Sequence, residues 1–408
     1  MPESNPALTL ALAMCFGILV QVISRHIKMP WIVLLLGAGI LLGPDILGWI
    51  NPASLGKAMH MIVGFAVAVI LFEGGMNLRL NHIKREQQVI RQLITVGALV
   101  TAIGGAISSK LIIGWDWRNS ILFGVLIIVT GPTVISPLLK RLRFRRSVST
   151  VLEAEGVLLD AIGAVLAVVA LEVALSPSGL SFIKGFFHII SRLLSGVIFG
   201  AAVGLGLALL LRIRRFIPES LENVFMLSMV FALFQISNTI SAESGVVAVT
   251  IAGLVVGNTK TAVRRELRDF EEEMTVLLIG MLFILLAADV QIVKLTSLGL
   301  RGISLVLVIM FILRPLAIFA GTWGSDLDLK QKTLLSWIAP RGIVAAAVAS
   351  LFSMELETHG FDGTQLQAMV FLLIILTVLQ AGLTGGITAS LLGLRKKTGT
   401  VWVILGVN

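Results

Sequence analysis

Three carboxylates stand in one long apolar stretch of this sequence, residues 148–172. Glu153 and Glu155 lie near its start, and Asp160 lies several residues inside it. A charge near the centre of a bilayer costs at least ~2.5–3.5 kcal/mol on insertion scales, so it persists where water, a partner or a bound ion compensates it. The pattern therefore favours an ion or proton site at Asp160. A structural carboxylate paired with a nearby arginine is the alternative.

Two other apolar stretches are interrupted by proline at their centres. One contains Thr130-Gly131-Pro132, and the other contains Pro340-Arg341-Gly342. Proline and glycine break the helical hydrogen-bond ladder, and the freed backbone groups survive at membrane depth only against protein or a wet cavity. Each break leaves a half-helix N-terminus with a partial positive charge and a C-terminus with free carbonyl oxygens. A simple proline kink is the alternative for either break alone.

A few other charged residues lie in or beside apolar stretches. Glu73 ends one stretch, where an interfacial pair with Arg79 and a role in ion binding both fit its position. Arg314 and Arg341 are the deeply placed cations. Glu271–Glu273 begin another stretch, where a helix N-terminus would stabilise acidic groups. Attraction of cations to the mouth of a pathway is the alternative for this acidic cluster.

The composition is that of a polytopic membrane protein. Of the 408 residues, 57% are hydrophobic and 13% are charged, whereas soluble domains carry about 25% charged residues. The single cysteine, Cys15, excludes a disulfide framework and a cysteine-based metal site. The net charge of +9 comes from short basic clusters between apolar runs, which is typical of cytoplasmic loops. We therefore expect a lipid bilayer as partner and no nucleic acid.

Apolar runs long enough to cross ~30 Å of hydrocarbon predict about thirteen transmembrane helices, an all-α fold. The runs lie at 6–24, 30–43, 59–77, 87–110, 119–139, 148–172, 182–211, 221–240, 243–258, 272–290, 297–321, 333–352 and 365–393. Basic residues follow the odd-numbered spans, which places the N-terminus outside and the C-terminus in the cytoplasm. The interrupted spans are the fifth and the twelfth. An odd offset of seven makes equivalent helices antiparallel, as in inverted repeats around a midplane site.

Four motifs resemble, in order and spacing, the monovalent cation/proton antiporters of the sodium/proton exchanger family (NhaP-like branch). The motifs are Leu71–Arg79, Thr130–Thr133, Glu155–Ala161 and Pro340–Ala347. The resemblance covers nearly the whole chain and implies a homodimer with the NhaA-like antiporter fold, in which two broken helices cross at the midplane. It divides residues 1–393 into a mobile core (spans 4–6 and 11–13) and a dimerisation scaffold (spans 1–3 and 7–10).

The resemblance also implies roles for individual residues. Asp160 matches the carboxylate that binds the cation or the proton. Thr130 and Gly156 match positions that contribute near the ion, and Glu73 matches a carboxylate that completes its coordination. Gly131 departs from the family pattern, because relatives usually have Asp there.

Glu155 and Arg341 are implied to form an ion pair that joins spans six and twelve, and Arg314-Pro315 resembles an Arg-Pro pair in the neighbouring span. Leu159 stands where many relatives have Asn. Because this departure and the one at Gly131 leave fewer side-chain oxygens in the crossing, selectivity for sodium over potassium does not follow from the resemblance.

The implied activity is secondary active antiport of Na⁺ or K⁺ against H⁺ by alternating access, with no cofactor and no enzymatic reaction. A single key acid preceded by Leu159 predicts electroneutral one-for-one exchange. The expected location is the cell (inner) membrane, with a role in pH homeostasis. A cation channel and a Na⁺-coupled solute symporter are the alternatives. An intramembrane aspartyl protease would need a second deep catalytic acid, and Asp289 lies too near the end of its span.

Residues 394–408 are expected to form a cytoplasmic tail after a basic stop at Arg395–Lys397. Residues Thr400–Asn408 alternate β-forming residues and end in Gly-x-Asn, which resembles the first strand of a Rossmann-type regulatory domain. An unstructured tail is the alternative.

Overall fold

A computed structural model describes the chain except at its two ends and at several short segments. The described residues are 5–27, 29, 31–131, 134–135, 138–139, 144–175, 179–212, 217–218, 221–259 and 265–395. Over these residues the chain is nearly all helical, and an isolated β-bridge joins Phe144 to Arg395. Residues 396–408, where a Rossmann-type strand is expected, lie outside the described part.

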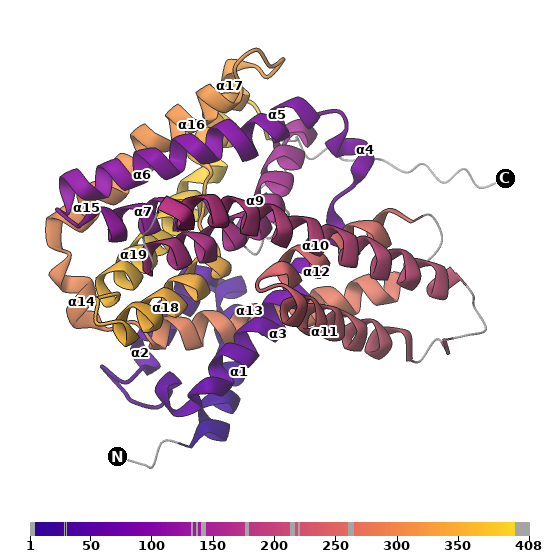
Figure 1. Cartoon of the computed structure of the whole chain (residues 1–408), viewed down its shortest axis with the longest axis horizontal. Helices are drawn as coiled ribbons and strands as arrows, with labels where there is room; N and C mark the ends of the chain where they lie inside the picture. The colour runs from indigo at the N-terminus through magenta and orange to yellow at the C-terminus, as the bar shows by residue number, and fades with distance from the viewer. Residues whose placement is uncertain are drawn as a thin grey trace.

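The helices fall where the sequence predicts membrane-spanning segments (Figure 1). In the first part of the chain they are α1 (Pro6–Ile27), α2 (Trp31–Leu42), η1 (Pro52–Leu55), α3 (Lys57–Asn77), α4 (Leu80–Ile83), α5 (Gln87–Gln92), η2 (Leu93–Gly97), α6 (Ala98–Ile112), α7 (Trp117–Leu126) and α9 (Arg146–Leu175). In the second part they are α10 (Gly179–Arg212), α11 (Glu222–Ile240), α12 (Ser244–Asn258), α13 (Arg265–Ala288), α14 (Ile292–Ser297), α15 (Gly299–Val308), η4 (Ile309–Leu313), α16 (Arg314–Gly321), α17 (Leu329–Trp337), α18 (Ile343–Thr358) and α19 (Thr364–Leu391).

Seven described helical segments are long and apolar enough to cross a membrane. They are Pro6–Ile27, Gln87–Ile112, Arg146–Leu175, Lys184–Arg212, Glu222–Ile240, Gly299–Gly321 and Thr364–Leu391, and shorter apolar helices lie at Trp31–Leu42, Met61–Asn77 and Ser244–Asn258. These segments confirm an all-α polytopic membrane protein. The number of crossings, about thirteen, stays a prediction.

The 30-residue helix α9 runs through the interior of the bundle (Figure 1). It packs against α7 and α18 and also against α10 and α12. Its sequence contains no proline between residues 146 and 175, and Gly163 lets the backbone of Val129 approach it. The helix therefore stays unbroken and carries its carboxylates into the centre of the molecule.

Two long helical segments share one irregularity. Gln87–Ile112 and Gly299–Gly321 each contain a π-helical turn, η2 and η4. Each turn packs against the other segment, η2 against α16 and η4 against α6, and the two segments lie side by side in Figure 1. Single π turns inside α-helices are frequent at functional sites. The segments correspond to predicted spans four and eleven, so this pair has the same offset of seven as the proline-interrupted pair.

Candidate functional site: a buried carboxylate beside two helix interruptions

Asp160 is fully buried in the middle of α9. Its side chain has no exposed surface, and among the residues that the structure describes neither carboxylate oxygen has a hydrogen-bond partner. The neighbouring Leu159 and Ala161 on the same helix are buried and apolar. Removing an ionised carboxylate from water without a partner is costly, so a proton or a cation must compensate Asp160 here.

The two proline-containing segments leave the helical conformation and touch each other. α17 ends at Trp337 and α18 begins at Ile343, with a non-helical segment between them that contains Pro340 and Gly342. Residues 127–131 follow α7 and are also not helical, while Pro132 lies outside the described residues. A Cβ atom added to Gly342 would lie 2.2 Å from Cα of Gly131. The crossing therefore requires glycine at position 342, because no side chain fits there against the backbone of Gly131.

The first interruption also lies directly against α9. The Thr130 hydroxyl donates to the backbone oxygen of Glu155 over 3.5 Å. A Cβ added to Gly163 would lie 2.7 Å from a methyl group of Val129. Since Glu155 precedes Asp160 and Gly163 follows it on α9, the non-helical backbone spans the level of Asp160.

Arg341 bridges the two interruptions. Its guanidinium donates to the backbone oxygen of Ile128 over 3.4 Å, and its backbone N–H donates to the Thr377 hydroxyl over 3.3 Å. The carbonyl freed by the first interruption thus receives a donor from the second, as buried backbone at membrane depth requires. Arg341 is buried, so its positive charge adds to the electrostatic field of the crossing.

The prediction that Arg341 pairs with Glu155 is wrong in this structure, because Glu155 pairs with Arg314. Arg314 Nη1 lies 2.5 Å from Glu155 Oε1, and Nη2 lies 2.9 Å from Oε2, a bidentate fork. Arg314 also donates to the backbone oxygen of Leu335 on α17. Both arginines are deeply placed in the sequence, and spacing alone could not show which one faces Glu155. In the structure, Arg314 directly follows the π turn η4.

Glu73 and Gly156 take up different positions relative to Asp160. Gly156 is buried on α9, one helical turn before Asp160. Glu73 is half-buried near the end of α3, and the Asn77 side chain donates to it over 2.7 Å. That Glu73 completes the coordination of an ion at Asp160 stays a prediction.

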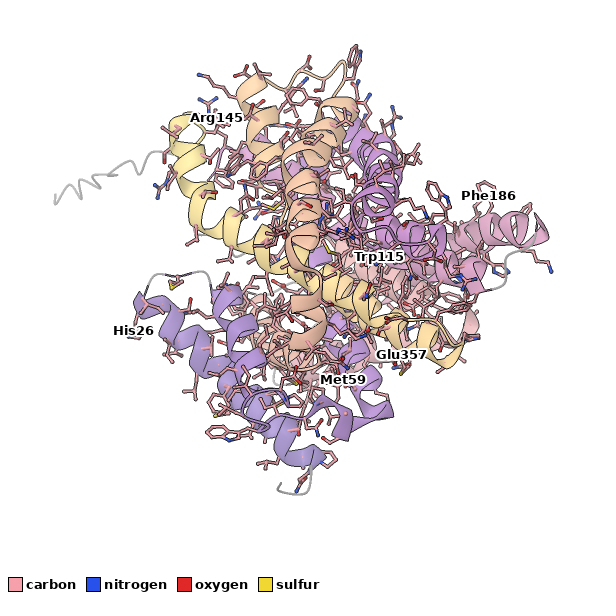
Figure 2. All side chains as sticks on the ribbon, turned by 90° about the vertical axis from the view of Figure 1, so that its left-hand side faces the viewer. His26, Met59, Trp115, Arg145, Phe186 and Glu357 are labelled. Carbon is pink, nitrogen blue, oxygen red and sulfur yellow. The ribbon has the colours of Figure 1, made fainter. Side chains whose placement is uncertain are left out.

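A cavity of about 650 Å³ leads toward this site. Ala164, four residues after Asp160 on α9, lines it together with Val344 at the start of α18. Met59 and Glu357 line it as well, and Figure 2 places them close together and far from Arg145. Water in this cavity can approach to within about one helical turn of Asp160.

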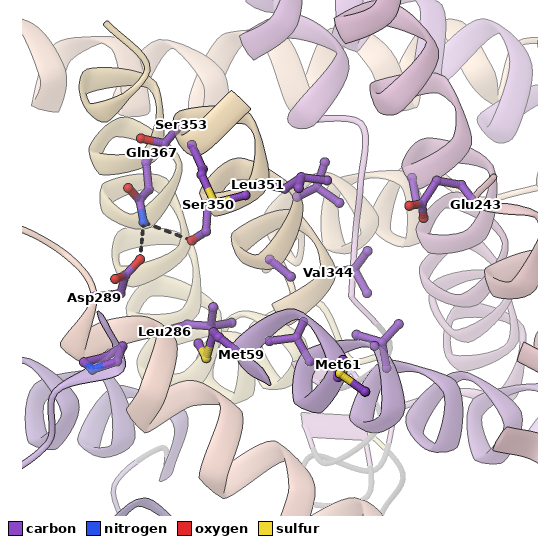
Figure 3. Close-up of a pocket in the computed structure, with 18 of the residues that line it drawn as sticks. Met59, Met61, Glu243, Leu286, Asp289, Val344, Ser350, Leu351, Ser353 and Gln367 are labelled. Carbon is purple, nitrogen blue, oxygen red and sulfur yellow. Dashed lines mark hydrogen bonds between the residues drawn. The ribbon is translucent and has the colours of Figure 1, made fainter. Parts of the chain in front are cut away.

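Polar groups line opposite sides of the cavity (Figure 3). Glu243, at the start of α12, lies on one side. On the other side, the Gln367 amide of α19 donates to Asp289 over 3.0 Å and to Ser350 over 2.9 Å. The three residues come from α19, from the end of α13 and from α18, so one amide links three segments of the chain.

The donor set at Asp160 suits a singly charged ion. In the described part of the chain, no three His, Cys, Asp or Glu side chains are grouped to hold a metal ion. A cation at Asp160 would find one carboxylate, the Thr130 hydroxyl and backbone carbonyl oxygens, the hard ligands that alkali cations prefer. A multi-helix membrane protein with a buried acid beside touching helix interruptions belongs to the class of secondary transporters.

Comparison with known proteins specifies this class. The family described as "Sodium/hydrogen exchanger, transmembrane" matches residues 10–391, so the chain belongs to the sodium/hydrogen exchanger family. It is similar to "Na(+)/H(+) antiporter 1" of Methanocaldococcus jannaschii, with 25% identity over 85% of this chain and 83% of the relative. It is also similar to "K(+)/H(+) antiporter NhaP2" of Shewanella oneidensis, with 28% identity over 91% of this chain and 64% of the relative.

A solved structure shares the fold. The sodium proton antiporter MjNhaP1 of Methanocaldococcus jannaschii, determined at pH 8, superposes with a TM-score of 0.83 at 24% identity. The match covers 94% of this chain and 98% of that chain. The antiporter fold predicted from the motifs is therefore confirmed.

Proposed function

We propose that Asp160 is the exchange site of this cation/proton antiporter, where a monovalent cation and a proton bind in competition. The observation that carries the proposal is the state of Asp160 itself, a carboxylate with no exposed surface and two unpartnered oxygens at the crossing of two helix interruptions. A bound cation compensates the charge through Asp160, the Thr130 hydroxyl and backbone oxygens. A bound proton removes the charge, and the cation leaves.

Competition at one acid couples the two fluxes. A proton and a cation cannot both neutralise the same carboxylate, so each binding event expels the other ligand. An empty, ionised Asp160 would be costly in the closed barrier between the two sides. The protein therefore changes between its two access states only with a proton or a cation bound at Asp160. Transport is then exchange and not leakage.

Glu155 and Arg314 hold the exchange site in place without taking part in it. Their bidentate pair leaves no net charge and fastens α9 to α16, while the bond from Arg314 to Leu335 fastens α17. Asp160 and Glu155 lie on one rigid helix, so the pair fixes the position of the exchanging acid relative to both interruptions.

The moving part is proposed to be a core of spans 4–6 and 11–13 that shifts against a scaffold of spans 1–3 and 7–10. The scaffold would form a homodimer in the cell (inner) membrane, with the N-terminus outside and the C-terminus in the cytoplasm. Tight packing supports the scaffold as one unit, since added Cβ atoms at Gly75 and Gly200 would lie 2.3 Å and 2.4 Å from backbone oxygens of α12. With this orientation the cavity opens to the outside.

Stoichiometry and cation identity follow from the same site. One titrating acid next to the apolar Leu159 supports electroneutral one-for-one exchange, in which an imposed voltage has no effect. The site is poor in side-chain oxygens, and the relatives' names include both Na⁺/H⁺ and K⁺/H⁺ antiporters. We propose Na⁺ or K⁺ as the transported ion.

Dissipation of a pH gradient in proteoliposomes tests the function. Lithium, sodium, potassium and rubidium are added in turn across a range of pH, with Asp160→Asn as the inactive variant. Exchange that saturates with one or more cations, ignores voltage and disappears in Asp160→Asn supports the proposal. Flux that neither moves protons nor saturates would indicate a channel, and flux that requires an organic solute would indicate a symporter.

A further inference from the structure

A second buried acid lies outside the exchange site. Glu271 on α13 is 1% exposed, and neither of its carboxylate oxygens has a hydrogen-bond partner in the part of the chain that the structure describes. Its neighbours in sequence, Glu272 and Glu273, are both exposed. Glu271 is therefore the member of this acidic cluster that points into the protein, where an ionised carboxylate needs compensation.

Two further oxygen-bearing groups accompany Glu271. Thr275 follows it by four residues, on the same face of α13, and its hydroxyl is also buried with no described residue bonded to it. Glu73 lies on α3, which packs against α13, and its negative charge repels that of Glu271. Two carboxylates and a hydroxyl thus lie on two packed helices, and two of these three side chains are buried with no hydrogen-bond partner among the described residues.

The helix N-terminus does not compensate Glu271. The sequence favours a role for Glu271–Glu273 at the start of a helix, but α13 begins at Arg265. Glu271 lies six residues further along the helix, and the partial positive charge of a helix N-terminus falls off within the first turn. A neighbouring carboxylate such as Glu73 adds repulsion, and within the described part of the chain no side chain bonds to Glu271, so a positive ligand would compensate this group of oxygens.

We propose that Glu271, Thr275 and Glu73 form a second monovalent-cation site between α3 and α13, separate from Asp160. Carboxylate and hydroxyl oxygens are the hard ligands that an alkali cation prefers. Both helices belong to the proposed scaffold, so an ion held here would join two scaffold helices and would not move with the core. The site would respond to the cation concentration on the side where the exposed Glu272 and Glu273 lie.

Cation binding to a chain that lacks the exchange acid tests this site. Purified full-length Asp160→Asn is titrated with NaCl and with KCl against choline chloride at constant ionic strength, and the thermal unfolding midpoint is followed. A ligand that binds the folded state alone raises this midpoint with concentration. We expect a cation-dependent rise in Asp160→Asn and its loss in Asp160→Asn/Glu271→Gln.

Matched variants keep the result interpretable. Asp160→Asn/Glu273→Gln removes an exposed acid two residues away and should keep the full cation response. Asp160→Asn/Thr275→Val should shift the response to at least several-fold higher cation concentration. Glu271→Gln removes an unpartnered charge, so the protein should fold and show an unchanged or higher midpoint without cations. No cation response in Asp160→Asn, or an equal response with Glu271→Gln, would overturn the proposal whatever the outcome at Asp160.

Discussion

Glu155 and Asp160 are five residues apart on α9, and both are buried. Glu155 receives two charge-assisted hydrogen bonds from Arg314, whereas no described residue bonds to either oxygen of Asp160. In the proposed cycle, the paired carboxylate of Glu155 keeps its charge and holds α9 in place. The unpartnered carboxylate of Asp160 needs a positive ligand, and exchange requires that one ligand can replace another.

At the residue scale, a double-mutant cycle distinguishes the two arginines. Glu155→Gln or Arg314→Gln each leaves a buried charge without its partner, which costs about 3–5 kcal/mol. We expect strong coupling between these two changes and weaker coupling between Glu155→Gln and Arg341→Gln. Unfolding midpoints of the purified single and double variants give the coupling energies. A larger coupling for Arg341 would show that the observed pairing is not the one that stabilises the protein.

At the scale of elements, the crossing of the two interruptions depends on contact between backbones. In Gly342→Ala the new methyl group would lie 2.2 Å from Cα of Gly131. Overpacking of this kind costs about 1–3 kcal/mol and sometimes more, and it would also displace the carbonyl groups around Asp160. We expect a lower unfolding midpoint and a loss of exchange well beyond the loss of folded protein.

Gly37→Ala is the matched control for this prediction. Gly37 is exposed in the middle of α2, and nothing lies within 4 Å of an added Cβ. Alanine has a higher helix propensity than glycine by about 1 kcal/mol, so this change should leave stability and exchange unchanged or slightly improved. Equal behaviour of the two alanine variants would contradict a tight crossing.

Much of the fold follows from patterns that act along the chain. The length of the apolar runs predicts the helices, and Pro340 and Gly342 predict the position of one interruption. Both predictions succeed because helix formation and helix breaking depend on residues that are close in sequence. The partner of Glu155 was not predictable, since it depends on how α16 and α18 are rotated against α9. Pro315 follows the π turn η4, whereas no proline lies in residues 87–112, so the sequence has no comparable signal for η2. Glu271 is buried and Glu272 is exposed, and this difference could not be predicted from the sequence.

At the scale of the whole molecule, a hydrogen bond at the cavity joins the proposed core to the proposed scaffold. Gln367, in the proposed core, donates to Asp289, in the proposed scaffold. Gln380, also on α19, donates to the backbone oxygen of Trp337 within the core. If the core shifts against the scaffold, the first bond must break in each cycle and the second must not.

The bond from Gln367 to Asp289 is formed in the state that has the cavity, so it stabilises that state. Gln367→Leu should therefore lower the population of the cavity-open state, whereas Gln380→Leu should leave it unchanged. A net hydrogen bond is worth about 0.5–1.5 kcal/mol, which corresponds to a roughly two- to tenfold change in the population of the open state. The readout is maleimide labelling of Ser353→Cys, a cavity residue, in chains whose Cys15 is replaced by serine. Labelling that is slowed equally by both leucine variants, or by neither, would argue against a core that moves relative to α13.

Competition at Asp160 can be measured directly by counting protons. Sodium or potassium is titrated calorimetrically into the purified chain in buffers of different ionisation enthalpy, and the protons released per bound cation are obtained from the difference. Glu271→Gln serves as the background, so that the proposed α3–α13 site does not contribute. We predict release that falls from about one proton per cation toward zero as pH rises, and neither binding nor release when Asp160→Asn is added. Cation binding without proton release at every pH, or the same release without Asp160, would contradict the account.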